Sequence, residues 1–104
     1  MATKRSERDE IKRFGGRPQP NSGRGSQKGD AKRGPFLIDV KEYVSSYGLS
    51  RTSWAKVSTD ASRHGLQPAL MVALGEGAEI VRLWVVGDSM MKEMLEAWEE
   101  KYAE

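Results

Sequence analysis

The apolar positions of this chain fall into short continuous runs that predict strands. Residues 36–40 are apolar except for one acid and follow a Gly-Pro turn signal, so we expect a strand there, paired in a hairpin with the residues before the turn. Residues 68–74 and 80–86 are nearly continuous apolar runs of strand length. The glycines between these two runs predict a turn, so the two strands should form an antiparallel hairpin.

Two stretches have the pattern of capped helices. Residues 6–14 are rich in helix-forming residues, with Ser6 as a candidate N-cap and two glycines that end the helix. Residues 50–64 place apolar side chains at helical spacing, begin at a serine that can cap the helix, and are followed by Gly65 as a stop. His64, the only histidine, should interact with the last carbonyls of this helix.

The last stretch, residues 88–102, should form a helix with Asp88 or Ser89 as its cap. Its apolar side chains make one stripe, whose members are Met91, Met94, Leu95, Trp98 and Tyr102. We expect this stripe to pack in the core. The alternative is an interface between two copies of the chain, because the stripe is long for a small core and glutamates cover the opposite side of the helix.

The composition fits one small domain. A length of 104 residues supports one modest core, so residues 1–104 should be a single domain, with residues 1–5 in part a flexible tail. There is no cysteine, which excludes a disulfide framework and is compatible with a reducing compartment. No apolar run approaches a membrane span and the basic N-terminus lacks the apolar region of a signal peptide. We expect a cytoplasmic protein with no membrane partner.

The net charge of +2 hides an uneven distribution. Residues 1–34 contain ten lysines and arginines against four acids, a net charge of +6, whereas residues 35–104 have a net charge of −4. The basic part is also rich in glycine, which suits phosphate contact through charge and close backbone approach. The alternative is a solubilising tail. The basic residues are Lys4, Arg5, Arg8, Lys12, Arg13, Arg17, Arg24, Lys28, Lys32 and Arg33.

The predicted first hairpin contains a candidate catalytic set. Side chains alternate along a strand, so Asp39 and Lys41 should share one face while the apolar residues share the other. The basic turn folds the chain back and should bring Asp30 close to Asp39. Two carboxylates at short range repel each other unless a cation lies between them, and Mg²⁺ suits such a pair. The alternative is a solvated strand face with an ion pair, because three-residue motifs arise by chance.

Further residues around this hairpin occur in a set order. An acidic helix with Glu7-Arg8-Asp9 comes first, then a Ser/Gly-rich loop over residues 20–29, then Asp30, then a strand with Asp39-Val40-Lys41, then a helix-to-strand passage over residues 63–74. This order resembles the PD-(D/E)XK nucleases, and within them the archaeal-type Holliday junction resolvases. The resemblance covers roughly residues 6–87. The chain differs from the family pattern in having Gly29 before the first acid and Asp39 where the resolvases usually have Glu.

The resemblance implies a fold, an activity and a set of site residues. The fold would be α/β with a restriction-endonuclease-like core, a central mixed sheet flanked by helices in the order α-β-β-α-β-β-α. The activity would be Mg²⁺-dependent cleavage of branched DNA such as a four-way junction, with Mn²⁺ as a substitute, by a homodimer, in a version whose small size suggests a phage. Asp30, Asp39 and Glu7 would hold the metal and Lys41 would be the catalytic lysine, with Asp9 or Glu10 as alternatives to Glu7. DNA contacts would come from Arg8, Arg13, Arg17, Ser22, Arg24, Lys28, Lys32 and Arg33.

Two other functions remain open. One is a non-catalytic DNA-binding protein that uses the basic part of the chain for contacts to the backbone of DNA. The other is a repair or restriction nuclease of the same superfamily with a different DNA substrate, because a fold does not determine a function.

Overall fold

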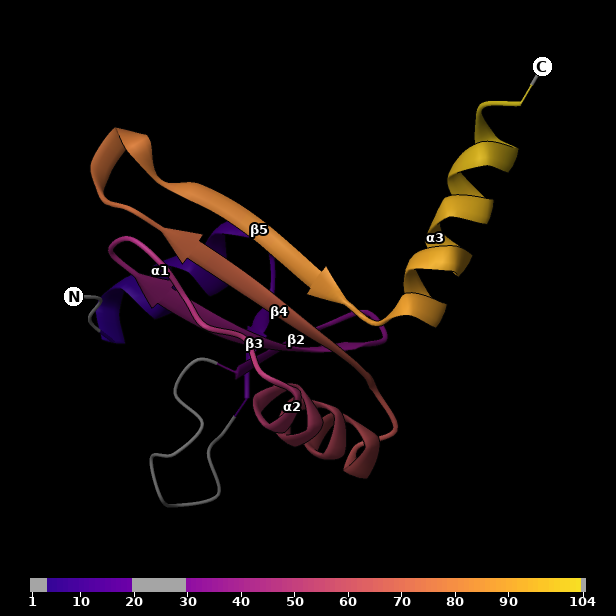
Figure 1. The fold of residues 1–104 in the computed structure, drawn as a ribbon, viewed down its shortest axis with the longest axis horizontal. Coiled ribbons are helices and arrows are strands. Elements are labelled where there is room, and N and C mark those ends of the chain that lie inside the picture. The colour runs from indigo at the N-terminus through magenta and orange to yellow at the C-terminus, as the bar shows by residue number, and fades with distance from the viewer. Residues whose placement is uncertain (1–3, 20–29, 104) are drawn as a thin grey trace.

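The chain folds around a five-stranded mixed sheet with three α-helices (Figure 1). The computed structural model describes residues 4–19 and 30–103. The elements are α1 (Lys4–Arg13), β1 (Arg17–Pro18), β2 (Asp30–Arg33), β3 (Phe36–Tyr43), α2 (Arg51–Arg63), β4 (Gln67–Leu74), the 3-10 turn η1 (Gly77–Glu79), β5 (Val81–Val86) and α3 (Asp88–Lys101). The predicted α/β class is confirmed. The sequence did not predict β1 or η1.

The strands lie in the order in which they occur in the sequence, β1-β2-β3-β4-β5. The pair β3 and β4 is parallel, and α2 makes the crossover between them. All other neighbours are antiparallel, so both predicted hairpins are confirmed. Gly34 supports the first hairpin, because its φ of 58° is a left-handed conformation that glycine adopts without strain.

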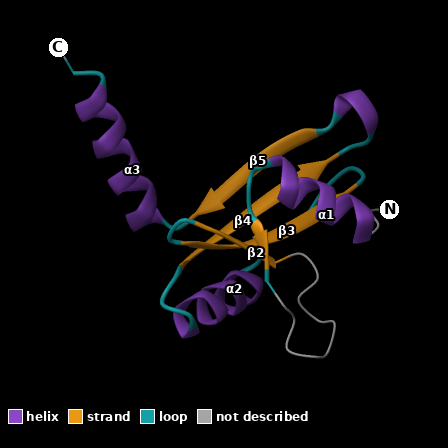
Figure 2. Cartoon of the chain, turned by 180° about the vertical axis from the view of Figure 1, so that it is seen from behind, coloured by secondary structure: helices purple, strands orange, loops and turns teal. Residues whose placement is uncertain are grey.

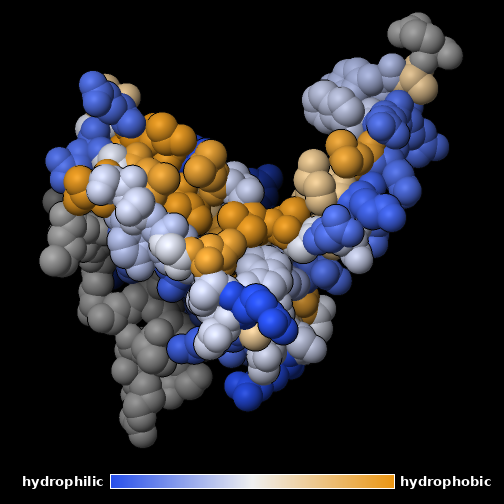
Figure 3. Space-filling view, viewed as in Figure 1, coloured by the Kyte–Doolittle hydropathy of each residue, from blue (hydrophilic) through white to orange (hydrophobic). Residues whose placement is uncertain are grey.

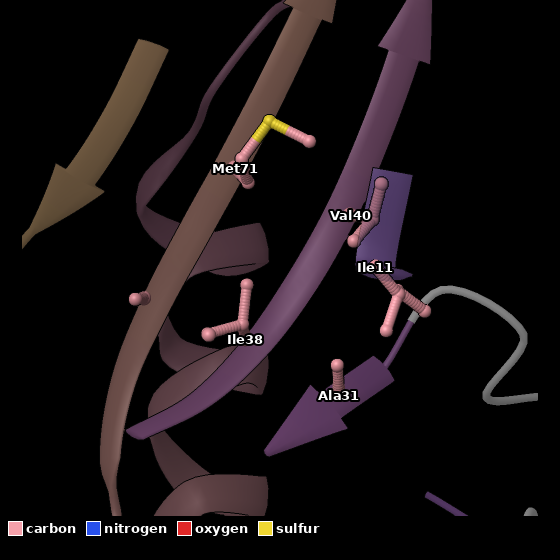
Figure 4. Packing of buried hydrophobic residues seen from close by; sticks show 6 residues of the cluster. Ile11, Ala31, Ile38, Val40 and Met71 are labelled. Atoms are coloured by element: carbon pink, nitrogen blue, oxygen red, sulfur yellow. The ribbon is translucent and has the colours of Figure 1, made fainter. Parts of the chain in front are cut away.

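Helix α1 covers one face of the sheet, which we call the α1 face. Ile11 of α1 packs there among buried side chains from three strands, and the labelled members of this cluster point toward one another in Figure 4. The strand alternation that puts Ile38 and Val40 on this face leaves Asp39 and Lys41 on the other. The buried cluster consists of Ile11, Ala31, Ile38, Val40, Ala69 and Met71.

Helix α2 covers part of the opposite face, which we call the α2 face. Val57 packs against Leu70 and Val72 of β4, with Trp54 at the margin of the cluster. Seen from behind, α1 crosses the near side of the sheet while α2 runs along its lower edge (Figure 2). The two helices thus enclose β3 and β4 from both sides.

The helix ends follow the sequence signals for α2 but less closely for α1. The Ser50 side chain accepts from the Ser53 amide at 3.1 Å and the Ser50 amide donates to the Ser53 hydroxyl at 3.0 Å, a reciprocal cap. His64 Nδ1 lies 2.9 Å from the Asp60 carbonyl oxygen, as predicted. Helix α1 begins at Lys4, so Ser6 lies inside it rather than at its cap. Within residues 4–19 and 30–103, no helix has the length and apolar content needed to cross a membrane.

Helix α3 stands apart from the rest of the domain (Figure 1). It has no buried residue, so the expectation that its apolar stripe packs in the core is wrong. The physical cause is the connection, because only Gly87 separates β5 from α3 and leaves no loop in which the helix could fold back. Gly87 is also the N-cap and offers no side-chain bond, so the predicted cap at Asp88 or Ser89 is wrong as well.

Candidate active site

Asp30 and Asp39 lie directly opposite each other on β2 and β3. Side chains of directly opposed residues in an antiparallel pair leave the sheet on the same side, about 5 Å apart at their Cβ atoms. Asp39 alternates with the apolar residues of the α1 face, so both carboxyls lie on the α2 face. The predicted approach of the two acids is therefore confirmed by the strand register.

The pKa of Asp30 is raised at this position. Burial and the charges of Asp39 and Asp60 raise the pKa of Asp30 from 3.8 to about 7. A hydrogen bond with Asp39 contributes to the shift, and Lys41 opposes it. At neutral pH, Asp30 is thus protonated far more often than an ordinary aspartate. A cation that replaced this proton would relieve the same repulsion.

Lys41 places a positive charge beside the two aspartates. Its Nζ lies 3.3 Å from Oδ2 of Asp39, two residues away on the same face of β3. Burial lowers the pKa of Lys41, but the charge and hydrogen bond of Asp39 outweigh it and the pKa is raised overall. Lys41 is therefore a fixed ammonium cation at neutral pH, suited to contact an anion rather than to take up a proton.

Asp60 of α2 is an acid that the sequence analysis did not single out. Its charge raises the pKa of Asp30, so α2 brings a third carboxylate toward the pair. Among the described residues, it pairs with Arg63, at 3.8 Å. The sequence signal was present but weak: Asp60 follows Val57 by three residues and directly precedes Ala61, which places it beside the buried side of the helix.

Two basic side chains lie opposite each other on the same sheet face as the acids. Arg17 of β1 pairs with Lys32 of β2, and Lys32 is two residues from Asp30. Like charges in directly opposed positions destabilise a hairpin unless an anion lies between them. Both residues are exposed. This pair gives the acidic site an adjacent point where a phosphate could bind.

The other predicted basic residues are used differently. Arg13 donates to the Glu10 carboxylate at 3.0 Å, and Arg33 donates to the Phe14 carbonyl, so both already have partners in the protein. Arg8 is exposed on α1, away from the α2 face. Ser22, Arg24 and Lys28 lie outside the described residues.

The acids of α1 do not join the pair. Glu7 and Asp9 add to the raised pKa of Glu42, whose side chain lies on the α1 face, and Glu7 is not among the causes of the Asp30 shift. Glu10 is buried and accepts a two-pronged bond from Arg82, with the closest contact 2.8 Å. The sheet thus separates Glu7, Asp9 and Glu10 from Asp30 and Asp39. Arg82, to which the sequence assigned no role, neutralises Glu10.

No protein-family model, curated protein or solved structure matches this chain. The candidate site therefore rests on its own geometry.

That geometry suits a metal held by few protein ligands. Within the described part of the chain, no three acidic or histidine side chains are grouped closely enough to hold a metal ion by themselves. Mg²⁺ is commonly bound by one or two carboxylates, with water and substrate phosphate in its other positions. The opposed carboxylates of Asp30 and Asp39 supply the hard oxygen ligands of this mode, and the relief of their repulsion favours cation binding.

Proposed function

We propose that this protein is a metal-dependent endonuclease that cuts branched DNA, most like a Holliday junction resolvase. One observation carries the proposal: Asp30 and Asp39 are directly opposed on one sheet face, and Lys41 binds Asp39 at 3.3 Å. Two carboxylates and a lysine in such an arrangement are the minimum for metal-assisted cleavage of a phosphodiester.

Each residue of the site has a part in this chemistry. Asp30 and Asp39 would hold Mg²⁺, which would supply polarisation of the scissile phosphate and a lowered pKa of water. Lys41 is held against Asp39, and its ammonium group would stabilise the charge that develops on the phosphate during attack. Asp60 adds negative potential that favours cation binding.

The neighbouring basic pair supports DNA as the substrate. Arg17 and Lys32 lie on the same face as Asp30, so a strand of DNA whose phosphates contact them passes the carboxylates. Contacts of this kind position the backbone without reading its sequence. This agrees with a nuclease that recognises the shape of its substrate.

The fold is compatible with the restriction-endonuclease-like core that the resemblance implies. Helices lie on both faces of a mixed sheet, and the acids and the lysine are on the second and third strands. That these elements correspond one by one to those of the nuclease core is part of the proposal. Glu7 is left out of the proposed site because α1 lies against the other face of the sheet.

The test is cleavage by the full chain with Mg²⁺ on four-way junctions, forks, flaps and plain duplex. We expect cleavage of the junction, and no cleavage by Asp39→Asn or Lys41→Ala although both still bind it. Lys12→Ala, which removes an exposed lysine on α1, is the matched control and should cut normally. Normal cleavage by the two site variants would show that the site is elsewhere.

Binding without cleavage by the unmodified protein would favour the alternative function. The exposed pair of Arg17 and Lys32 suits a non-catalytic DNA-binding protein as well as a nuclease. Preferential cutting of a fork, flap or duplex in the same panel would instead indicate a repair or restriction type of nuclease.

A further inference from the structure

Helix α3 presents an apolar surface that no other described part of its own chain covers. The stripe predicted from the sequence is exposed along its whole length, and in Figure 3 apolar side chains line two sides of a hollow between the sheet and α3. We call these side chains the α3 stripe: Met91, Met94, Leu95, Trp98 and Tyr102, which are 39 to 62% exposed.

The sheet has a matching surface. Helix α2 covers β4 but not the far half of β5, so Val81 and Leu83 remain 52% and 48% exposed on the α2 face. Tyr43 of β3 lies in the same row as Val81, across Leu74, and is 43% exposed. Tyr43, Val81 and Leu83 form what we call the sheet patch. The sheet patch is thus an exposed apolar surface of the size that a helix covers, and the α3 stripe is an exposed apolar helix surface.

The connection between the two surfaces prevents them from meeting within one chain. Gly87 alone joins β5 to α3, and the helix leaves the sheet rather than lying on it. A short connection that keeps an element from its own domain favours its exchange with an identical domain. We propose that two copies of this chain form a symmetric dimer in which the α3 stripe of each copy packs on the sheet patch of the other.

Charge argues against other occupants of the α3 stripe. Helix α3 contains five acids and two lysines, a net charge of −3, so nucleic acid and anionic lipid would be repelled. Glu93, Glu96 and Glu100 lie opposite the stripe at helical spacing and stay in water in the dimer.

Size also fits a second copy. The exchange is reciprocal, so eight large apolar side chains from each copy enter the interface. This is enough for on the order of 1,500 Å² of buried surface, the size of a stable protein interface.

The dimer also affects the proposed active site. Tyr43 of the sheet patch lies two residues from Lys41 on the same face of β3, and Leu83 lies in the row of Lys41 and Val72, two strands, about 10 Å, away. The α3 of the second copy would therefore stand beside the site of the first and hold the two sites at a fixed separation. The exchange itself does not depend on nuclease activity.

The first test is the mass of the full chain by sedimentation equilibrium at micromolar concentration. We expect twice 11.6 kDa for the unmodified chain and 11.6 kDa for Trp98→Glu. Ala97→Glu adds the same charge one residue away, outside the stripe and at helical spacing from Glu93 and Glu100, and should remain a dimer. A monomeric unmodified chain would overturn the proposal, as would an equal effect of the two variants.

The second test distinguishes exchange from other dimers, and uses the fact that the chain has no cysteine. Leu83→Cys protein is mixed with Leu95→Cys protein and oxidised. Exchange predicts a disulfide-linked heterodimer as the main product. Linkage of Leu95→Cys only to itself would indicate that two α3 helices pair instead. A chain that carries both Leu83→Cys and Leu95→Cys tests the remaining case, because an internal disulfide in its monomer would show that α3 folds back on its own sheet.

The same measurements on Asp39→Asn separate this proposal from the nuclease proposal. Asp39 lies outside both surfaces, so this variant should remain an exchanged dimer whether or not the unmodified protein cuts DNA. If the unmodified protein is a dimer but does not cut DNA, the exchange proposal stands and the nuclease proposal fails. If it cuts DNA as a monomer, the nuclease proposal stands and the exchange proposal fails.

Discussion

Glu10 and Arg82, 72 residues apart, are joined by a two-pronged ion pair across the α1 face. Nε and Nη2 of Arg82 donate to the Glu10 carboxylate at 2.8 to 3.1 Å, and Arg13 donates to the same group at 3.0 Å. The hydrogen bond from Arg82 is the main reason why the pKa of Glu10 is lowered despite burial. The pair ties the first helix to the last strand of the sheet.

Removing the arginine of this pair should destabilise the domain. Arg82→Met keeps the apolar stem but leaves a buried carboxylate with only Arg13. We expect a loss of about 1–3 kcal/mol in the free energy of unfolding, less than for a fully buried pair because 32% of the Arg82 side chain is exposed. Urea unfolding measures the loss. Combining Arg82→Met with Glu10→Gln should recover part of it, and simple additivity of the two losses would contradict the pairing.

Asp30→Asn should stabilise the protein in a way that depends on pH. The pKa of Asp30 rises from 3.8 to about 7 on folding, so between these values the folded state holds a proton that the unfolded state has lost. The contribution of Asp30 to stability therefore falls as pH rises through this window and is constant above it. The amide cannot ionise, so we expect a Tm about 4–8 °C higher than that of the unmodified protein at pH 8, for a screened gain of about 1 kcal/mol.

The control for this prediction is the same comparison at pH 4, where the difference in Tm should be small because Asp30 keeps its proton in both states. Glu42, whose pKa burial and the acids of α1 raise to about 7, titrates in both proteins and cancels from the difference. Mg²⁺ adds a second readout. It should raise the Tm of the unmodified protein at pH 8 and leave that of Asp30→Asn unchanged, whereas equal stabilisation of both proteins would place the metal elsewhere.

The contact between Asp30 and Asp39 was predictable because it depends on local signals. A strand run, a Gly-Pro turn and strict alternation determine the register of a hairpin once its turn is placed. The bond between Glu10 and Arg82 was not predictable in this way. Nothing local distinguishes Glu10 from Glu7 or Asp9, and only the packing of α1 on the sheet decides which acid is buried.

The position of α3 was mispredicted for a related reason. The stripe correctly indicated a helix with one apolar side, but helical periodicity does not say what that side contacts. The deciding feature was the length of the connection, one glycine between β5 and α3. Asp60 was missed because a single acid on a mixed helix face carries no signal until α2 is placed over the sheet.

The basic pair on β1 and β2 should control the salt dependence of DNA binding. If Arg17 and Lys32 each contact one phosphate, then Arg17→Ala and Lys32→Ala should each reduce the slope of log K against log salt by about one. Arg8→Ala removes an exposed arginine from α1, on the other side of the sheet, and should leave the slope unchanged. Fluorescence anisotropy with a labelled junction at several salt concentrations measures all three. A change for Arg8→Ala alone would indicate that DNA binds on the α1 face.

Glu7 provides the sharpest test of which acids serve the site. The resemblance to resolvases assigns it to the metal, whereas in the structure its charge acts on Glu42 and not on Asp30. We therefore expect Glu7→Gln to cut a four-way junction within about threefold of the unmodified rate, a change of less than 1 kcal/mol in the barrier, while Asp30→Asn abolishes cutting. Single-turnover cleavage with saturating Mg²⁺ measures both. A loss of cleavage with Glu7→Gln as severe as that with Asp30→Asn would mean that α1 moves toward the pair when DNA and metal bind.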